Sequence, residues 1–239
     1  MASNLPGDIC VGQHSVCIVR AAKLKPNCRP LGGVDSGFIT AGIISATASP
    51  VLQEAQTLES VNGCGRISFT VERPAQIRAY DLSGELTFFD HEMMAILFGG
   101  EVIVGSAGSD FTGDNIGWAA PNYTEDPPAP VYVEFIVKTV GEGIGDCGSA
   151  DGVPAAVGHI FGKANLIPGD LSLGNEVSNV SFSGRSVANP NLFDGPWNDW
   201  PGVGNIPNSP HAQVSYSLDE YTAIEDLAAC GYATLPEGS

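Results

Sequence analysis

Residues 143–148, Gly-Ile-Gly-Asp-Cys-Gly, have the GxGxxG spacing with which dinucleotide-binding domains hold a pyrophosphate. That chemistry requires a helix directly after the glycines, because the pyrophosphate binds at the helix N-terminus. Residues 149–154 continue instead as small, turn-forming residues, and strands and helices do not alternate elsewhere in the sequence. We interpret the match as a chance one in a glycine-rich loop, and we expect no bound cofactor.

Other residue patterns that could support catalysis or ligand binding are equally incomplete. The sequence has no GxSxG, HExxH or GxxxxGK[ST] motif and no CxxC pair. Its four histidines are widely spaced, at His14, His91, His159 and His211. A Ser-His-Asp triad assembled from distant residues remains compatible with the sequence, but no spacing points to one. We therefore predict no enzyme and no catalytic residue.

Acidic turns are the remaining candidates for a metal site. Asp110 with Asp114, and Asp146 with Asp151, carry the oxygen ligands that calcium prefers. Both lack the spaced series of ligands and the closing glutamate of an EF-hand. We favour structural turns over a metal site at both places.

The charge balance limits the function further. The chain has 27 acidic and 10 basic residues, for a formal charge of −17, and only 15% of its residues are charged. A protein that grips nucleic acid needs clustered Lys and Arg. We expect this acidic chain to repel nucleic acid, although the acidity could merely keep the protein soluble. The low share of charged residues suggests that other subunits cover part of the surface.

The first ten residues lack the basic and apolar regions of a signal peptide, and no apolar run reaches the roughly 18 residues of a membrane span. We therefore expect no export signal and no membrane association. Without export, the six scattered cysteines are expected to be reduced thiols.

Alternating apolar residues predict a mainly β protein built from antiparallel strands, as a sandwich or barrel. The clearest pattern covers 66–72 and 78–88, which predicts a hairpin across Pro74 with Asp81 and Glu85 on its wet face. Further strands are predicted at 131–137, 180–185 and 211–218, with weaker candidates at 15–22, 38–48 and 157–166.

Two helices accompany these strands. The first covers 91–98, with Asp90 as its N-cap and Gly99-Gly100 as its stop. The second covers 218–229 at the C-terminal end, where Ser217 and Glu220 form a capping-box pattern.

Two long segments, 105–130 and 188–210, are rich in Gly, Pro, Asn and Asp and show little periodicity. The second contains Phe193, Trp197 and Trp200, whose large rings favour burial. They could pack on their own sandwich or on a neighbouring subunit, and we expect the neighbouring subunit. No linker divides the chain, so we predict one domain over 1–239.

Several short motifs follow one another along nearly the whole chain. They are Val16 to Leu24, Asn62-Gly63-Cys64-Gly65, Tyr80-Asp81-Leu82, Asp90 to Gly100 with Glu92 and Leu97, and Gly184 to Pro190 continuing through Gly195 to Pro201. In this order they resemble the major tail tube proteins of actinobacteriophages of the siphovirus type. His91 and the pair Met93-Met94 depart from the pattern, which favours a small residue and leucines there.

The resemblance implies a virion structural protein that forms hexameric rings. Stacked rings would make a hollow tail tube, lined by hairpins, through which genomic DNA passes without specific binding during ejection. Implied partners are further copies of the chain, the tape measure protein, and the tail terminator and tip proteins. The implied location is the virion tail, assembled in the host cytoplasm, and the family supplies no catalytic residues.

For this chain we expect a negative lumen faced by Asp81 or Glu85, since carboxylates repel phosphates. Two alternatives stay open. One is another virion component, such as a tail terminator or head decoration protein. The other is a carbohydrate-binding β-sandwich with Trp197 and Trp200 as platforms for sugar rings.

Overall fold

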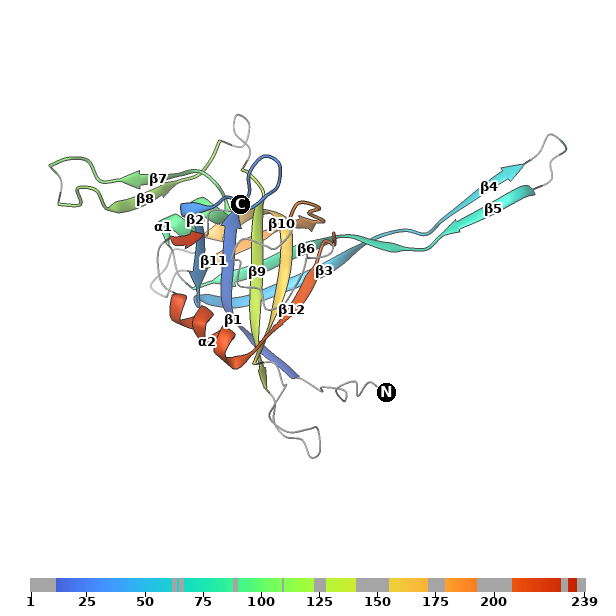
Figure 1. The fold of residues 1–239 in the computed structure, drawn as a ribbon. Coiled ribbons are helices and arrows are strands. Elements are labelled where there is room, and N and C mark those ends of the chain that lie inside the picture. The colour runs from blue at the N-terminus through green and yellow to red at the C-terminus, as the bar shows by residue number, and fades with distance from the viewer. Residues whose placement is uncertain are drawn as a thin grey trace, which may run out of the picture.

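Antiparallel strands form a sandwich from which two hairpins project on opposite sides (Figure 1). The computed structural model describes residues 12–61, 64, 67–87, 90–108, 110–122, 128–140, 155–171, 179–192, 208–228 and 232–235. The mainly β fold class, with few helices, is as predicted from the alternation of apolar residues.

The elements occur in the following order. They are β1 (Gly12–Lys23), β2 (Gly33–Thr40), β3 (Ile43–Gln53), β4 (Gln56–Val61), β5 (Ile67–Arg73), β6 (Gln76–Leu86), α1 (His91–Leu97), β7 (Glu101–Val104), β8 (Asn115–Ala119), β9 (Val131–Val140), β10 (Ala156–Leu171), β11 (Val180–Val187), β12 (Ala212–Tyr216), α2 (Leu218–Leu227) and β13 (Ala233–Leu235).

One long strand, β10, joins the two layers of the sandwich. The main sheet runs in the order β13-β2-β1-β9-β10-β11-β6-β3, and β12 also pairs with β10. Residues 156–160 of β10 pair with both β9 and β12, whereas residues 164–171 pair with β11. The change of partner coincides with a register shift between Phe161 and Ala164, where the sheet bends from one layer into the other.

The main core lies between these layers and under α1. Side chains of β1 and β9 meet those of β6 and β11, and Phe135 stacks on Phe182 with 6.2 Å between the ring centroids. The buried face of α1 contributes Met93 and Met94. The alternation predicted for 131–137 and 180–185 therefore places the expected apolar faces inward.

A second core lies on the opposite face of β9, under α2, and contains a buried ion pair. Arg20 Nε donates to Glu134 Oε2 at 2.6 Å, and these two residues are directly paired between β1 and β9. The hydroxyls of Tyr132 and Tyr216 donate to the same carboxylate at 2.7 and 2.6 Å. All four side chains are buried, and each carboxylate oxygen has partners, as a buried charge requires.

Both helices begin where the sequence predicts. Asp90 Oδ1 accepts hydrogen bonds from the N–H groups of Glu92 and Met93, and Gly99 and Gly100, with φ of +75° and +89°, follow the C-cap of α1. The capping box of Ser217 and Glu220 opens α2. This helix ends at Leu227, two residues before the predicted end at 229.

The predicted hairpin of 66–72 with 78–88 is wrong. Strands β5 and β6 run in the same direction on one side of a much longer hairpin, and they pair with β4 and β3 respectively. The chain reverses between Val61 and Ile67, which are themselves paired. Pro74 interrupts a strand here, because proline removes a donor from the ladder without itself reversing the chain.

Two other boundaries differ from the prediction. The single strand expected over 38–48 is divided into β2 and β3 by a bend at Gly42, whose N–H donates to Thr40 Oγ1. The segment 105–130, expected to be a loop, contains β8, which pairs with β7. Strand β8 has only five residues, and the polar, glycine-rich composition around it shows no alternation from which a strand could be predicted.

Removing the buried carboxylate should destabilise the sandwich strongly. Glu134→Ala leaves the Arg20 guanidinium buried without its counter-ion, which typically costs about 3–5 kcal/mol. Urea unfolding monitored by circular dichroism measures the change.

The control is the double variant Arg20→Met with Glu134→Leu, which removes both charges together. It should lose much less than Glu134→Ala. Equal losses in the two variants would contradict a cost that arises from the unpaired guanidinium.

Candidate functional site

The outer face of β11, β6 and β3 is polar and rich in hydroxyls. Cross-strand pairs place residues of the three strands side by side on this face. They are Ser45, Thr47 and Ser49 on β3, Asp81, Ser83 and Glu85 on β6, and Ser181, Ser183 and Arg185 on β11. The inward residues of the same strands, such as Leu82 and Phe182, are buried. We call these nine residues the hydroxyl face.

The charges on the hydroxyl face are few and partly compensated. Arg185 donates to both carboxylate oxygens of Asp81, at 2.7 and 3.2 Å, across directly paired strands. The hydrogen bond and charge of Arg185 lower the pKa of Asp81, and the pair is exposed to solvent. Glu85 is half-buried and forms no ion pair with another described residue. Glu85 therefore supplies the uncompensated negative charge of this face.

Both predicted lumen residues thus lie on one polar face, but no local pattern in the sequence indicates the partner of Asp81. Arg185 is 104 positions away, and only the pairing of β6 with β11 brings the two together. In the strand predicted at 180–185, Val180 and Phe182 are buried, and Arg185 lies on the opposite face with Ser181 and Ser183.

Strands β3 and β6 extend beyond the sandwich and continue as β4 and β5, forming a long two-stranded arm (Figure 1). We define the arm as residues 49–79. Along it Leu52, Val71 and Ile77 expose 61%, 44% and 47% of their surface. A two-stranded ribbon in water is marginally stable and leaves both edges unpaired. The arm therefore has the character of a segment that another chain covers.

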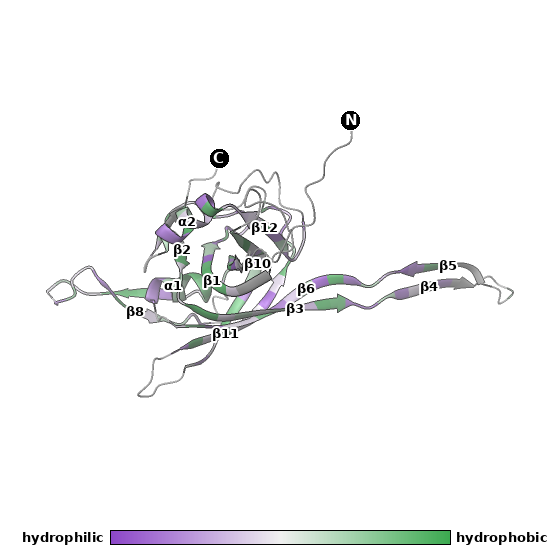
Figure 2. Cartoon of the chain, turned by 90° about the horizontal axis from the view of Figure 1, so that it is seen from below, coloured by the Kyte–Doolittle hydropathy of each residue, from purple (hydrophilic) through white to green (hydrophobic). Residues whose placement is uncertain are grey.

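The β7–β8 hairpin projects on the side opposite to the arm, and Figure 2 shows the same opposition from a perpendicular direction. Its root is fixed: Trp118 Nε1 donates to Gly99 O at 2.8 Å, and the Asn115 amide donates to the Glu92 carboxylate of α1. Its outer part exposes Val104 and Phe111, by 54% and 59%.

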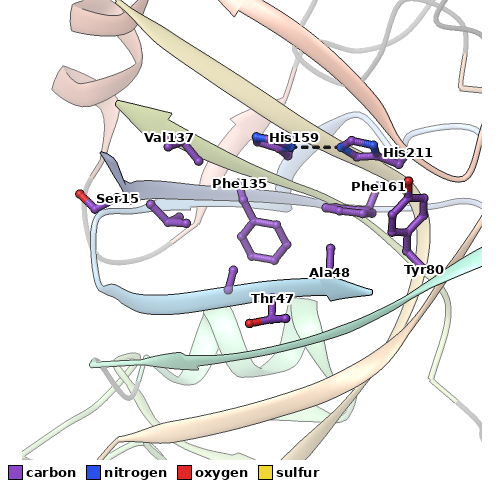
Figure 3. A pocket seen from close by; sticks show the side chains of 11 residues that line it. Ser15, Thr47, Ala48, Tyr80, Phe135, Val137, His159, Phe161 and His211 are labelled. Atoms are coloured by element: carbon purple, nitrogen blue, oxygen red, sulfur yellow. Dashed lines mark hydrogen bonds between the residues drawn. The ribbon is translucent and has the colours of Figure 1, made fainter. Parts of the chain in front are cut away.

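A cavity of about 480 Å³ opens between the layers of the sandwich (Figure 3). Small side chains of β3, Ala46 and Ala48, line it together with Tyr80, Phe135 and Phe161. The lining is completed by two imidazoles, and His159 Nδ1 lies 3.1 Å from His211 Nε2. The sequence predicted two unrelated histidines here, and the antiparallel pairing of β10 with β12 is what joins them.

Burial disfavours a charge on either imidazole of this cavity. Burial lowers the pKa of His159, although the charge of Glu134 opposes this shift. Burial also lowers the pKa of His211, and the charge of His159 lowers it further. A neutral pair can share one N–H···N hydrogen bond, whereas two imidazolium rings have only donors and repel each other.

Phe193, Trp197 and Trp200 lie outside the described residues, as do Gly143 to Gly148 and the pair Asp146 and Asp151. The segment that precedes the aromatics is anchored on the sandwich. Asn189 Nδ2 donates to the carbonyls of Cys28 and Gly162, and Leu192 is buried.

Comparison of the sequence with models of known protein families and with curated proteins gave no match. Among the described residues, no group of three His, Cys, Asp or Glu side chains could hold a metal ion. No helix in the described part of the chain has both the length and the apolar character needed to cross a membrane.

The imidazole pair should make stability depend on pH. A base whose pKa is lowered on folding binds fewer protons than in the unfolded chain, so stability is lost as the pH falls through about 6.5. Urea midpoints measured between pH 8 and pH 5.5 should decline less in the variant His159→Asn with His211→Gln than in the wild type.

The matched control is Phe161→Leu, which changes the same cavity without a titratable group. It should lower the midpoint by a similar amount at every pH. A double variant that keeps the full wild-type decline would show that groups other than His159 and His211 cause it.

Proposed function

We propose that this chain is a structural subunit of a siphovirus tail tube, in which hexameric rings stack around the path of the genomic DNA. The observation that carries the proposal is the arm, which extends from the sandwich with apolar side chains exposed and both edges unpaired. In a tube of many copies, neighbouring subunits cover such an arm and satisfy its edges.

The motifs that resemble tail tube proteins fall on the elements that such a role needs. Residues 16–23 lie in β1, between β2 and β9 of the main sheet, and the motif Asn62 to Gly65 falls between β4 and β5 in the sequence. Tyr80-Asp81-Leu82 lies in β6 and residues 184–187 in β11, so both contribute to the hydroxyl face. This agreement between sequence motifs and structural elements supports the proposal.

The hydroxyl face suits the wall of a channel for DNA. Serine and threonine hydroxyls keep a wall wet without the fixed cations that would hold phosphates. Arg185, the cation of this face, is bound to Asp81, and Glu85 leaves a negative remainder. DNA can then slide along such a wall.

Purified protein tests the proposal directly. We expect sedimentation and negative-stain microscopy to show rings and tubes with sixfold symmetry. A tail terminator or head decoration protein would stop at single rings or trimers. Tubes with threefold or fourfold symmetry, or an absence of assembly together with the tail tip proteins, would overturn the proposal.

Shortening the arm should block assembly and leave the subunit folded. Gln53 and Gln76 are directly paired, so an Asn-Gly turn that replaces residues 54–75 closes the ladder at that point. We expect native circular dichroism, because the sandwich keeps its own pairs between β3 and β6, and we expect no tubes in negative-stain microscopy.

As a control, Thr57→Ser with Thr70→Ser alters the exposed arm without shortening it, and this variant should assemble normally. If the shortened variant still forms tubes, the arm is not an assembly element.

Reversing the charge of the hydroxyl face should slow DNA ejection without preventing assembly. The variant Asp81→Lys with Glu85→Lys also frees Arg185, so each subunit presents three cations to phosphate. Ejection from particles carrying this variant should be slower than from the wild type, and added salt should reduce the difference because it screens phosphate contacts.

The control variant, Asp219→Lys with Asp226→Lys, makes the same change of charge at exposed positions of α2, off this face. Its ejection rate should match the wild type. Equal slowing in both variants would mean that net charge, and not the hydroxyl face, sets the rate.

A further inference from the structure

We propose that the β7–β8 hairpin of one copy docks on the base of the arm of the next copy, a contact that rests on the proposed role as a self-assembling subunit. The arm base is defined here as Leu52, Arg73, Ile77 and Arg78. The partner is therefore a second copy of this chain, and the contact joins two different surfaces.

Both surfaces expose apolar side chains in the single chain. On the arm base, Leu52 and Ile77 are directly paired, share one face of the ribbon, and are 61% and 47% exposed. On the β7–β8 hairpin the exposed apolar residues are Ile103, Val104, Phe111 and Ile116, at 46–59%. Clustered exposed apolar residues of this kind mark surfaces that bind another protein.

The charges of the two surfaces are opposite. Residues 101–119 contain Glu101, Asp110 and Asp114 and no Lys or Arg. The arm base contributes Arg73 and Arg78, and neither forms an ion pair with another described residue. Complementary charges of this kind select a partner and its orientation.

Arg78 is the stronger candidate of the two arginines. Arg73 borders a cavity of about 340 Å³ that Glu54 and Glu72 also line, so carboxylates of its own chain already lie near it. Arg78 is the extra residue at the register shift between Leu52 and Val51, next to the exposed apolar pair. An acidic hairpin with an apolar tip matches that combination.

The placement of the two surfaces determines the kind of assembly. The arm and the β7–β8 hairpin project from opposite sides of the sandwich in both views (Figures 1 and 2). Contact between two different surfaces is heterologous, and each copy then keeps one free hairpin and one free arm. Such contacts continue from copy to copy until a ring closes or a filament grows, whereas a two-fold dimer would need one self-complementary surface.

Two charge-reversed variants and their mixture test this contact. The first variant is Asp110→Lys with Asp114→Lys, and the second is Arg73→Glu with Arg78→Glu. Each should raise the concentration needed for assembly by about tenfold or more, the effect of roughly 1.4 kcal/mol. In an equimolar mixture, every reversed hairpin can meet a reversed arm of opposite charge, so assembly should return with the two variants alternating.

The outcomes separate this contact from the proposed function. If the wild type forms tubes and both variants do so at the same concentration, the docking is overturned and the tube subunit stands. If the variants fail alone and also fail when mixed, the contact between these two surfaces is overturned. If the wild type itself does not assemble with the tail tip proteins, the proposed function is overturned, and with it the docking contact. Asp219→Lys with Asp226→Lys is the matched control and should assemble as the wild type does.

Discussion

Strands β3 and β6 belong to the core of the sandwich and to the exposed arm at once. Within the sandwich they carry Leu82 and Leu86, which are buried, and beyond it they carry Leu52 and Ile77, which are not. The register of one ladder therefore governs both regions. A slip of one residue would turn Leu82 and Leu86 outward, so core burial fixes the face on which the arm presents its apolar pair. The proposed assembly by the arm thus depends on packing inside the subunit.

The sandwich can hold such an arm because its central strands are buried on both faces. Strand β9 packs Val133 and Phe135 against the layer of β6 and β11, and Tyr132 and Glu134 against the α2 side. The Arg20–Glu134 pair adds a polar constraint between β1 and β9, because a shifted register would leave both charges buried and unpaired. The buried polar residues of the sandwich therefore help to hold β1 and β9 in one register.

Local pattern was sufficient for several strands and for the starts of both helices, and insufficient for the partners of the strands. Period-two alternation located β9 and β11, and the caps at Asp90 and Ser217 located the helix starts, because these signals lie within a few residues. The arm was missed because Pro74 was interpreted as the turn, although Asn62-Gly63 is the stronger hairpin signal. The Asp81–Arg185 pair and the His159–His211 pair depend on pairing between distant strands, which no local spacing encodes.

The small number of charged residues follows from what the different surfaces must do. A subunit with partners on several sides loses free energy wherever an unpaired charge becomes buried, so large parts of its surface favour hydroxyls, glycine and small apolar residues. A wall beside DNA excludes free cations for a separate reason, since each would hold a phosphate. Two of the ten cations are paired within the chain: Arg20 is buried on Glu134, and Arg185 is bound to Asp81. Arg78 stands on the exposed base of the arm without such a partner among the described residues, and this is where a second chain can supply one.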